Sequence, residues 1–405
     1  PGYGAPPPPP PGASGKGKGG LIAALVAGGA VLVLLICGGL VWAFSGDGSD
    51  PPTIDDKPVD AANAACGKKL AFLGPTSGEY GETGAGIRNG AKLAVDEFRD
   101  KNPECKIELV EYDTKDARGE AAEAAEEIAK DESIIGVVGP VYSVDAPPAA
   151  PKLDKAGVAM ISPTASKDDL TDQGWKAFHR LVAPDSTQAS ASAEFLDQFD
   201  VTRVLVVSDE NVYFRTLAKV ATERLGEKAV RTVTFNSRNP DFTAIAKWAK
   251  ANKVDGTFFS GLDDSALKYL RKIRGAGVVG PVVAPSTAYN ASMAAEARSH
   301  KWFWVSCVCA PPTADSRFTR AYSRAYDKEP GYYAAEAYDA AMVFLRGVVD
   351  KRATRAEMLE YVHSYQRAGI TKKIKFDDKG GITPDLPVFF YRAEKHGFEY
   401  DRRID

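Results

Sequence analysis

Several loops of this sequence carry side chains that could bind a small polar molecule. One of them contains Ser143, which lies between an apolar run at 134–138 and a helix-like run that begins at 146. A helix that begins there presents free backbone N–H groups, and the serine hydroxyl adds a further hydrogen-bonding group. Hydroxyl, aromatic and carboxylate side chains also follow other apolar runs, at 77–84, 163–166, 185, 209–213, 261–264 and 285–289. Lys167, at the edge of one of these loops, is the basic residue among them. This chemistry suits a small ligand that is partly cationic or zwitterionic.

No set of residues with a recognisable catalytic or metal-binding spacing accompanies these loops. The histidines, at 179, 300, 363 and 396, lack partners at metal-ligand spacing, and neither C-x-x-C nor H-E-x-x-H occurs. The sequence also lacks a G-x-S-x-G elbow and a P-loop. The cluster "GETGAG" at 81–86 has its glycines in the wrong order for a dinucleotide-binding turn. We therefore predict that the protein is not an enzyme and uses no cofactor.

The pattern of apolar and amphipathic runs predicts the elements that hold these loops. From residue 69 onward, short apolar runs alternate with runs of helical periodicity, and the rhythm starts again after Pro184. Such alternation is typical of α/β folds in which helices cover both faces of a parallel sheet. In open sheets of this kind, ligands bind beyond the carboxyl ends of the strands, which is where the polar loops lie.

The predicted elements form two successive series. We expect strands at 70–74, 106–113, 133–139, 158–163, 202–209, 231–237, 255–261, 282–286 and 302–307. We expect helices at 84–100, 119–131, 146–156, 213–226, 241–252, 263–275 and 289–298. In the first of these helices, five apolar side chains fall on one face: Ile87, Ala91, Ala94, Val95 and Phe98.

The N-terminal part of the chain differs in composition from the rest. Residues 1–20 are rich in Pro and Gly, so we expect a disordered cytoplasmic spacer, with a polyproline ligand for an aromatic groove as the alternative. Residues 21–44 carry no charge and, at about 1.5 Å per residue, can cross a bilayer of about 30 Å, which predicts one uncleaved transmembrane helix. Lysines precede this helix and aspartates follow it in the acidic linker at 45–65. The positive-inside rule then places the remainder of the chain outside the cell.

Length, charge and cysteines narrow the remaining possibilities. The chain has 405 residues, a net charge of −3 and no long basic run, so we expect more than one domain and no nucleic-acid partner. Cys66 and Cys105 precede the first two predicted strands, and an extracellular disulfide or two free buried thiols are both consistent with that placement. Cys307 and Cys309 share one face of a predicted strand, so we expect them to be poor disulfide partners for each other.

Six segments, in consistent order over about residues 69–400, carry a family resemblance: "FLGPTSGEYGETGAGIRNGAKLAVDE", "GVVGPVYSVDAPPAAP", "AMISPTAS", "VAPDSTQ", "GYYAAEAYDAAMVF" and "KIKFDDKGGI". They resemble the type I solute-binding proteins of branched-chain amino acid ABC transporters, the Leu/Ile/Val-binding type. The resemblance implies two Rossmann-like lobes that are joined by three crossings and close over the ligand. It places the crossings near 181–185, 307–311 and 369–373. The first lobe then comprises 66–184 and 310–369, and the second 185–309 and 370–405.

The resemblance also implies roles for individual residues. Ser143 matches the serine that binds the ligand α-carboxylate at a helix N-terminus. Ser166 matches a hydroxyl residue that touches both the carboxylate and the ammonium group, and the carbonyl region of Thr164 faces the ammonium group. Asp185 matches an acidic residue that supports the ammonium group. Tyr213 matches an aromatic residue that lies over the ligand.

The remaining matches are wall positions and one departure from the family pattern. Tyr333 and Thr83 fall near wall positions of the pocket. An acidic residue that the family often has after the strand at 282–286 is replaced by Ser286, so Asp263 or Asp264 is expected to substitute from the neighbouring loop. The helix N-cap is the alternative role for Ser143, Ser166 and Asp185, and ordinary packing is the alternative role for Tyr213.

Two functions follow from these expectations. The first is an extracellular solute-binding protein, tethered by one membrane helix, that delivers an amino acid or similar small polar metabolite to an ABC permease. The second is the ligand-sensing ectodomain of a longer signalling protein such as a sensor kinase, which a sequence beginning at Pro1 rather than Met would allow.

Overall fold

The computed structural model describes residues 59–405, apart from gaps at 79, 116–117, 289–293, 295, 299, 301, 385 and 395–396. Within that range no helix is both long enough and apolar enough to cross a membrane. The expected membrane helix at 21–44, the spacer at 1–20 and most of the linker at 45–65 lie outside the described residues.

The first sheet is entirely parallel and has the strand order β2-β1-β3-β4-β5. Its strands are β1 (Lys69–Gly74), β2 (Glu108–Asp113), β3 (Ile134–Val138), β4 (Ala159–Ser162) and β5 (Phe178–Arg180). Alternate residues of β1 point to opposite faces, as the pleat requires. Leu70 and Phe72 join one buried cluster, and Ala71 and Leu73 join another.

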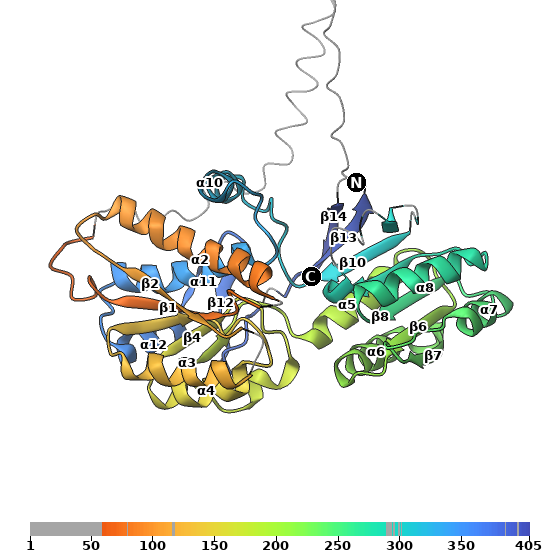
Figure 1. The fold of residues 1–405 in the computed structure, drawn as a ribbon, viewed down its shortest axis with the longest axis horizontal. Helices are drawn as coiled ribbons and strands as arrows, with labels where there is room; N and C mark the ends of the chain where they lie inside the picture. Colours follow the sequence, from red (N-terminus) through yellow and green to blue (C-terminus); the bar gives the residue numbers. More distant parts are fainter. Residues whose placement is uncertain are drawn as a thin grey trace, which may run out of the picture. The chain divides into compact units, whose positions relative to one another are not determined.

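Five helices cover this sheet and complete what we call the first lobe. One face packs against α2 (Gly81–Lys101), α11 (Ala334–Val349) and α12 (Arg355–His363), and the other against α3 (Arg118–Lys130) and α4 (Ala146–Lys155). The blue α11 and α12 lie among the red-to-yellow elements of the first lobe, so the chain returns to this lobe late in the sequence (Figure 1). The predicted apolar face of α2 is confirmed, because its five residues are all buried.

The second sheet has the order β14-β13-β10-β9-β8-β6-β7 and forms the second lobe with its helices. Its strands are β6 (Val204–Asp209), β7 (Ala229–Phe235), β8 (Gly256–Ser260), β9 (Val282–Pro285), β10 (Phe303–Cys307), β13 (Val388–Glu394) and β14 (Gly397–Ile404). The helices α5 (Asp185–Asp197) and α6 (Val212–Leu225) cover one face, and α7 (Thr243–Ala251) and α8 (Asp263–Gly275) cover the other. β13 pairs in antiparallel orientation with β10 and with β14, and the other neighbouring strands of this sheet are parallel. The predicted α/β fold with parallel-rich sheets is therefore confirmed.

The chain passes between the two lobes three times. At the first crossing, Leu181 packs in the core of the first lobe, and the next residue, Val182, packs in a core of the second. At the second, Ser306 and Cys307 belong to the second sheet, and the backbone of Ala310 binds α11 of the first lobe.

The third crossing lies further along the chain than the expected 369–373. The hairpin of β11 (Gln366–Ala368) and β12 (Lys373–Lys375) is followed by a segment whose apolar residues Ile374, Phe376 and Ile382 pack in the core of the first lobe. β13 then begins at Val388 in the second sheet, so the crossing lies between Ile382 and Val388. The alternating apolar residues of this segment fill the first-lobe core and delay the crossing.

The four cysteines of the described residues form two disulfides. Cys66 and Cys105 are joined beside the starts of β1 and β2. Cys307 and Cys309 are also joined, which contradicts the expectation that they would be poor partners. That expectation assumed an extended strand through both residues, but β10 ends at Cys307 and the chain bends. The bend brings the two Cα atoms to 5.1 Å, within the usual range for a disulfide.

Candidate functional site

The loops after β3 and β4 place three predicted hydroxyl residues next to one another. Ser143 lies in the turn between β3 and α4, and its Oγ accepts a hydrogen bond from the Lys167 N–H over 3.3 Å. The Thr164 hydroxyl donates to the carbonyl oxygen of Val141. Neither Ser143 nor Ser166 is a helix N-cap, because the N-caps of α4 and of the short helix at 168–172 are Asp145 and Lys167. The two serine hydroxyls therefore do not have the simple capping role that the sequence left open.

Asp185 begins α5 in the second lobe and is joined directly to this group. Its backbone N–H donates to the Ser166 carbonyl oxygen over 2.8 Å, and the Ser166 side chain lies close enough to its carboxyl group to lower the pKa of that group. The residue is only 4% exposed, and its Oδ1 atom has no hydrogen-bond partner. A buried carboxylate oxygen without a partner is costly, so this atom is the clearest polar position on which a ligand could act.

Two tyrosines lie close enough to Asp185 for its charge to affect them. Tyr213, in the first turn of α6, packs on the core between α5 and α6, and burial raises its pKa well above the ordinary value. Tyr333 immediately precedes α11 and contacts the cores of both lobes. Burial raises its pKa as well, and the charges of Glu336 and Asp185 act in the same direction. Both rings therefore stay neutral at physiological pH.

Ser286 lies in the same group, whereas two other predicted residues are placed elsewhere. Ser286 follows β9, and its side chain lies close enough to Tyr333 to lower the pKa of the Tyr333 hydroxyl. Thr83 is exposed in the first turn of α2, and Asp263 begins α8, where its Oδ1 accepts the Asp264 N–H. The structure thus brings together, as the core of the site, one set of predicted residues: Ser166, Asp185, Tyr213, Ser286 and Tyr333.

Sequence analysis missed two charged residues beside Asp185. Arg180 ends β5 and is 5% exposed, and its Nη1 donates to the Lys167 carbonyl over 2.7 Å and to the Ser166 carbonyl over 3.3 Å. Asp168 faces the same region and accepts the backbone N–H of Ser186. A lone arginine in the run "FHRLVAPD" just before the first crossing was the available signal for Arg180.

The charges around Asp185 explain its protonation behaviour. Burial raises the pKa of its carboxyl to about 6, and the charge of Asp168 adds to that effect. The nearby Ser166 hydroxyl and the cations Arg180 and Lys167 oppose the increase. At neutral pH the group is therefore a buried carboxylate that a positively charged ligand would stabilise. No group of His, Cys, Asp and Glu side chains within the described residues is arranged to hold a metal ion.

Comparison with known proteins assigns the fold to a known family. Residues 68–397 match the family described as periplasmic binding protein. The Leu/Ile/Val-binding protein BraC3 of Rhizobium johnstonii is 33% identical over 199 residues, which are 47% of this chain and 54% of that protein. The match thus spans about half the length of that relative. A leucine-, isoleucine-, valine-, threonine- and alanine-binding protein of Pseudomonas aeruginosa is 24% identical over 78% of this chain and 87% of its own.

Solved structures show the same fold with different ligands. The substrate-binding protein LivJ of Streptococcus pneumoniae, in complex with isoleucine, has a TM-score of 0.70 at 24% identity and covers 82% of this chain and 99% of its own. A solute-binding protein from R. palustris in complex with benzoate has a TM-score of 0.65 at 18% identity, with 82% and 94% of the two chains covered. At these identities the likeness establishes the fold, and the ligand has to be argued from the site residues.

Proposed function

Because the chain belongs to the periplasmic binding protein family, we propose that its two lobes close over an α-amino acid, which it delivers to an ABC permease. Branched-chain amino acids are the first candidates, since the curated relatives are named for binding them. The family consists of solute-binding proteins rather than enzymes, so we expect no turnover of the ligand. A similar small polar metabolite is the second candidate.

The observation that carries this proposal is the buried, unpartnered Oδ1 of Asp185 beside Tyr213 and Tyr333. An ammonium group placed there would supply the missing hydrogen bond and neutralise the charge, and a tyrosine face would add a cation–π contact. The carboxylate of the same ligand would lie at Ser143 and Ser166, near the N-terminus of α4, with Thr164 beside them. In leucine, isoleucine and valine, the ammonium and carboxylate groups are attached to the same α-carbon atom.

The replacement of an acidic residue by Ser286 then has a compensating neighbour. Asp168 contributes a second negative charge near Asp185, and Ser286 orients the Tyr333 hydroxyl. We propose that Asp168 takes over the electrostatic role of the missing acid. Thr83 and Asp263 remain candidates for the rim of the pocket, where they would meet the ligand only when the lobes close.

We further propose that residues 21–44 tether the binding domain to the membrane and that residues 45–65 link the two. The match to the family described as periplasmic binding protein supports an extracytoplasmic location of the binding domain. Family membership favours solute capture for a permease over the sensing of a ligand by a signalling protein.

The test is calorimetric titration of the purified protein, freed of bound ligand, with the standard amino acids and with benzoate. We expect micromolar binding of at least one branched-chain amino acid, and a loss of at least about tenfold in Ser143→Ala and in Asp185→Asn. Ser364→Ala, which removes a hydroxyl at the C-terminal end of α12, is the matched control and should bind like the wild type. Binding of benzoate but of no amino acid would contradict the proposed ligand class.

A further inference from the structure

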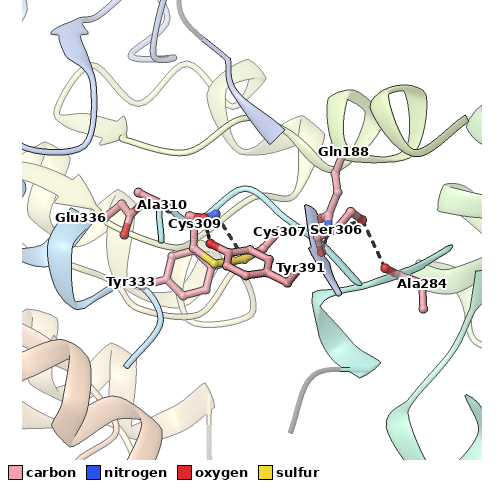
Figure 2. The surroundings of a disulfide bond; sticks show 9 residues. All are labelled: Gln188, Ala284, Ser306, Cys307, Cys309, Ala310, Tyr333, Glu336 and Tyr391. Carbon is pink, nitrogen blue, oxygen red and sulfur yellow. Dashed lines mark hydrogen bonds between the residues drawn. A yellow bond between two sulfur atoms is a disulfide. The ribbon is translucent and has the colours of Figure 1, made fainter. Parts of the chain in front are cut away.

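The second crossing between the lobes is fixed on both sides of a very short segment. On the second-lobe side, the Gln188 side chain donates to the Ser306 carbonyl over 2.7 Å, and the Ser306 hydroxyl donates to the Ala284 carbonyl over 3.3 Å. On the first-lobe side, the Ala310 N–H donates to Glu336 Oε1 over 2.6 Å. Residues 307–309 therefore form the end of the second lobe at this crossing, directly before the contact of Ala310 with the first lobe (Figure 2).

The disulfide between Cys307 and Cys309 lies in that segment. It closes a small ring that includes the backbone of Val308, and both sulfur-bearing side chains are buried. The Cys309 N–H donates to the Cys307 Sγ over 3.2 Å, and the Tyr391 hydroxyl donates to the Cys309 carbonyl over 2.9 Å. The backbone around Val308 is thus held by the disulfide and the second lobe directly before the first-lobe contact of Ala310.

The same disulfide contacts a tyrosine of the candidate site. The Tyr333 hydroxyl lies 3.6 Å from the Cys307 Sγ, to which it can donate, and Figure 2 shows its ring beside the sulfur pair. Tyr333 has a left-handed backbone with φ of 62°, which is unusual for a residue other than glycine. Its ring packs against the cores of both lobes, and Ser286 lies close to its hydroxyl group. A change at Cys307 would therefore alter the position of the Tyr333 side chain.

We propose that the Cys307–Cys309 disulfide is a positioning element of the hinge and that, through Tyr333, it sets the affinity of the site for its ligand. The proposal rests on the proposed function for its ligand, but its effect on the hinge does not depend on the ligand's identity. With the ring closed, the crossing and Tyr333 are held near one arrangement. With the ring open, ligand binding must also order Val308 and Tyr333, and that cost lowers the affinity.

The proposal includes a reduction step that a dithiol can supply. A thiolate of the dithiol attacks one sulfur atom, a mixed disulfide forms, and the second thiol of the reagent closes its own ring. The protein gains two thiols with two electrons and two protons, and the dithiol is oxidised to a cyclic disulfide. Because the protein disulfide is buried, the attack requires an opening of the hinge. Bound ligand that holds the lobes closed should therefore slow the reduction.

The test compares two double variants that each lose one disulfide. In Cys307→Ser/Cys309→Ser we expect the dissociation constant of the amino acid ligand to rise at least about fivefold. In Cys66→Ser/Cys105→Ser, which removes the disulfide at the base of the first lobe, we expect a change of less than about twofold. Dithiothreitol treatment of the second variant then reduces only the hinge disulfide, should weaken binding by the same factor, and should be reversed by reoxidation.

Two further measurements separate positioning from simple loss of stability. Saturating ligand should slow the alkylation of Cys307 and Cys309 under dithiothreitol at least about fivefold, as mass spectrometry would show. In a double-mutant cycle, the effects of Cys307→Ser/Cys309→Ser and of Tyr333→Phe on the dissociation constant should not be additive in free energy. Additive effects, or equal dissociation constants for the oxidised and reduced hinge, would overturn the proposal.

If the wild type bound no amino acid, the proposed function would fail while the hinge proposal kept its own test. Hydrogen exchange at the amides of residues 308–310 and 333–337 should then be faster in Cys307→Ser/Cys309→Ser than in Cys66→Ser/Cys105→Ser. Equal exchange in those segments would overturn the hinge proposal by itself. Should the hinge variant fail to fold, the dithiothreitol-treated Cys66→Ser/Cys105→Ser protein takes its place.

Discussion

The backbone N–H of Asp185 donates to the carbonyl oxygen of Ser166 over 2.8 Å. This hydrogen bond joins the first residue of α5 in the second lobe to the loop after β4 in the first. It places the buried carboxylate of Asp185 and the Ser166 hydroxyl side by side at the first crossing. A ligand that binds both groups would therefore act where the chain passes from one lobe to the other.

Asp185→Asn should make the ligand-free protein more stable while it weakens binding. Burial raises the pKa of Asp185 from 3.8 to about 6, so the unfolded chain loses this proton at a lower pH than the folded protein. The free energy of unfolding should accordingly fall as the pH rises from about 4 to 6, by about 3 kcal/mol in total, and then stay level. Asparagine cannot ionise, so the variant should lack this fall. Denaturant unfolding at about pH 4 and about pH 7.5 measures the difference.

Saturating ligand should reverse the order of stability of the wild type and the Asp185→Asn variant. Saturating amino acid should raise the melting temperature of the wild type, through the linkage of binding to folding, and should hardly change that of Asp185→Asn. The affinity of the wild type should also fall below about pH 6, as the carboxylate becomes protonated. A variant that is less stable than the wild type at neutral pH and binds the ligand equally well would assign Asp185 a purely structural role.

Glu336, which lies at the second crossing, should cause a second pH dependence of stability. Burial raises the pKa of its carboxyl to about 7, and the nearby Lys372 and the Ala310 N–H oppose that increase. The raised pKa means that stability should fall as the pH rises from about 4.5 to 7 and then stay level. Glu336→Gln keeps an acceptor for Ala310 and should remove this part of the pH dependence.

Glu336→Ala is the matched comparison for that variant. It leaves the Ala310 N–H without its acceptor and should be about 1–3 kcal/mol less stable than Glu336→Gln at every pH between about 5 and 8. Urea unfolding of both variants across this range checks the two effects. The assignment of the titration to Glu336 would be wrong if the stability of Glu336→Gln kept the wild-type pH profile.

Much of the fold could be predicted from the sequence because its signals are local. The apolar runs at 133–139 and 255–261 become β3 and β8, and the helix predicted at 263–275 is α8 with the same bounds. The rule that ligands bind at strand ends also selected Ser166 and Asp185, which the structure places next to each other at the first crossing. Such inferences need only periodicity and the rule that ligands bind at strand ends.

The features that could not be predicted depend on contacts between distant segments. β13 pairs with β10 across a long separation in sequence, and β14 extends the sheet by pairing with β13, which no local pattern indicates. Arg180 was missed because its role comes from the carbonyl groups that surround it and not from its own spacing. The Cys307–Cys309 pairing was expected to be poor because the apolar run does not indicate that β10 ends at Cys307 and that the chain bends there.

Gly90 and Gly86 provide a matched pair on α2. A Cβ atom at Gly90 would collide with the carbonyl oxygen of Ala334, at the start of α11, so Gly90→Ala should force the two helices apart and cost about 1–3 kcal/mol. At Gly86 the nearest atom would be the Tyr322 Oη at 3.9 Å, an ordinary contact. Gly86→Ala should therefore gain up to about 1 kcal/mol from helix propensity. Chemical unfolding distinguishes the pair, and equal effects would argue against close packing of α2 on α11.

Arg355 should stabilise the first lobe without any effect on the ligand. Its guanidinium group donates to four carbonyl oxygens at the end of α3 and the start of β3, at 2.7–3.0 Å: those of Ile128, Ala129, Asp131 and Ile134. A helix end presents unpaired carbonyl groups, and a planar cation with several donors can satisfy several of them together.

Arg355→Lys keeps the charge but offers one donor group in place of the planar fork. We expect it to lower the free energy of unfolding by about 1–3 kcal/mol, because most of these carbonyl groups lose their charged donor. Arg320→Ala, on the exposed face of α10 (Ser316–Tyr326), is the control and should change stability by less than about 0.5 kcal/mol. The ligand affinity of both variants should equal that of the wild type, since these carbonyls lie at the start of β3 and Ser143 lies beyond its opposite end. If the Arg355→Lys variant were as stable as the wild type, the charge, and not the fork of donors, would be what holds the end of α3.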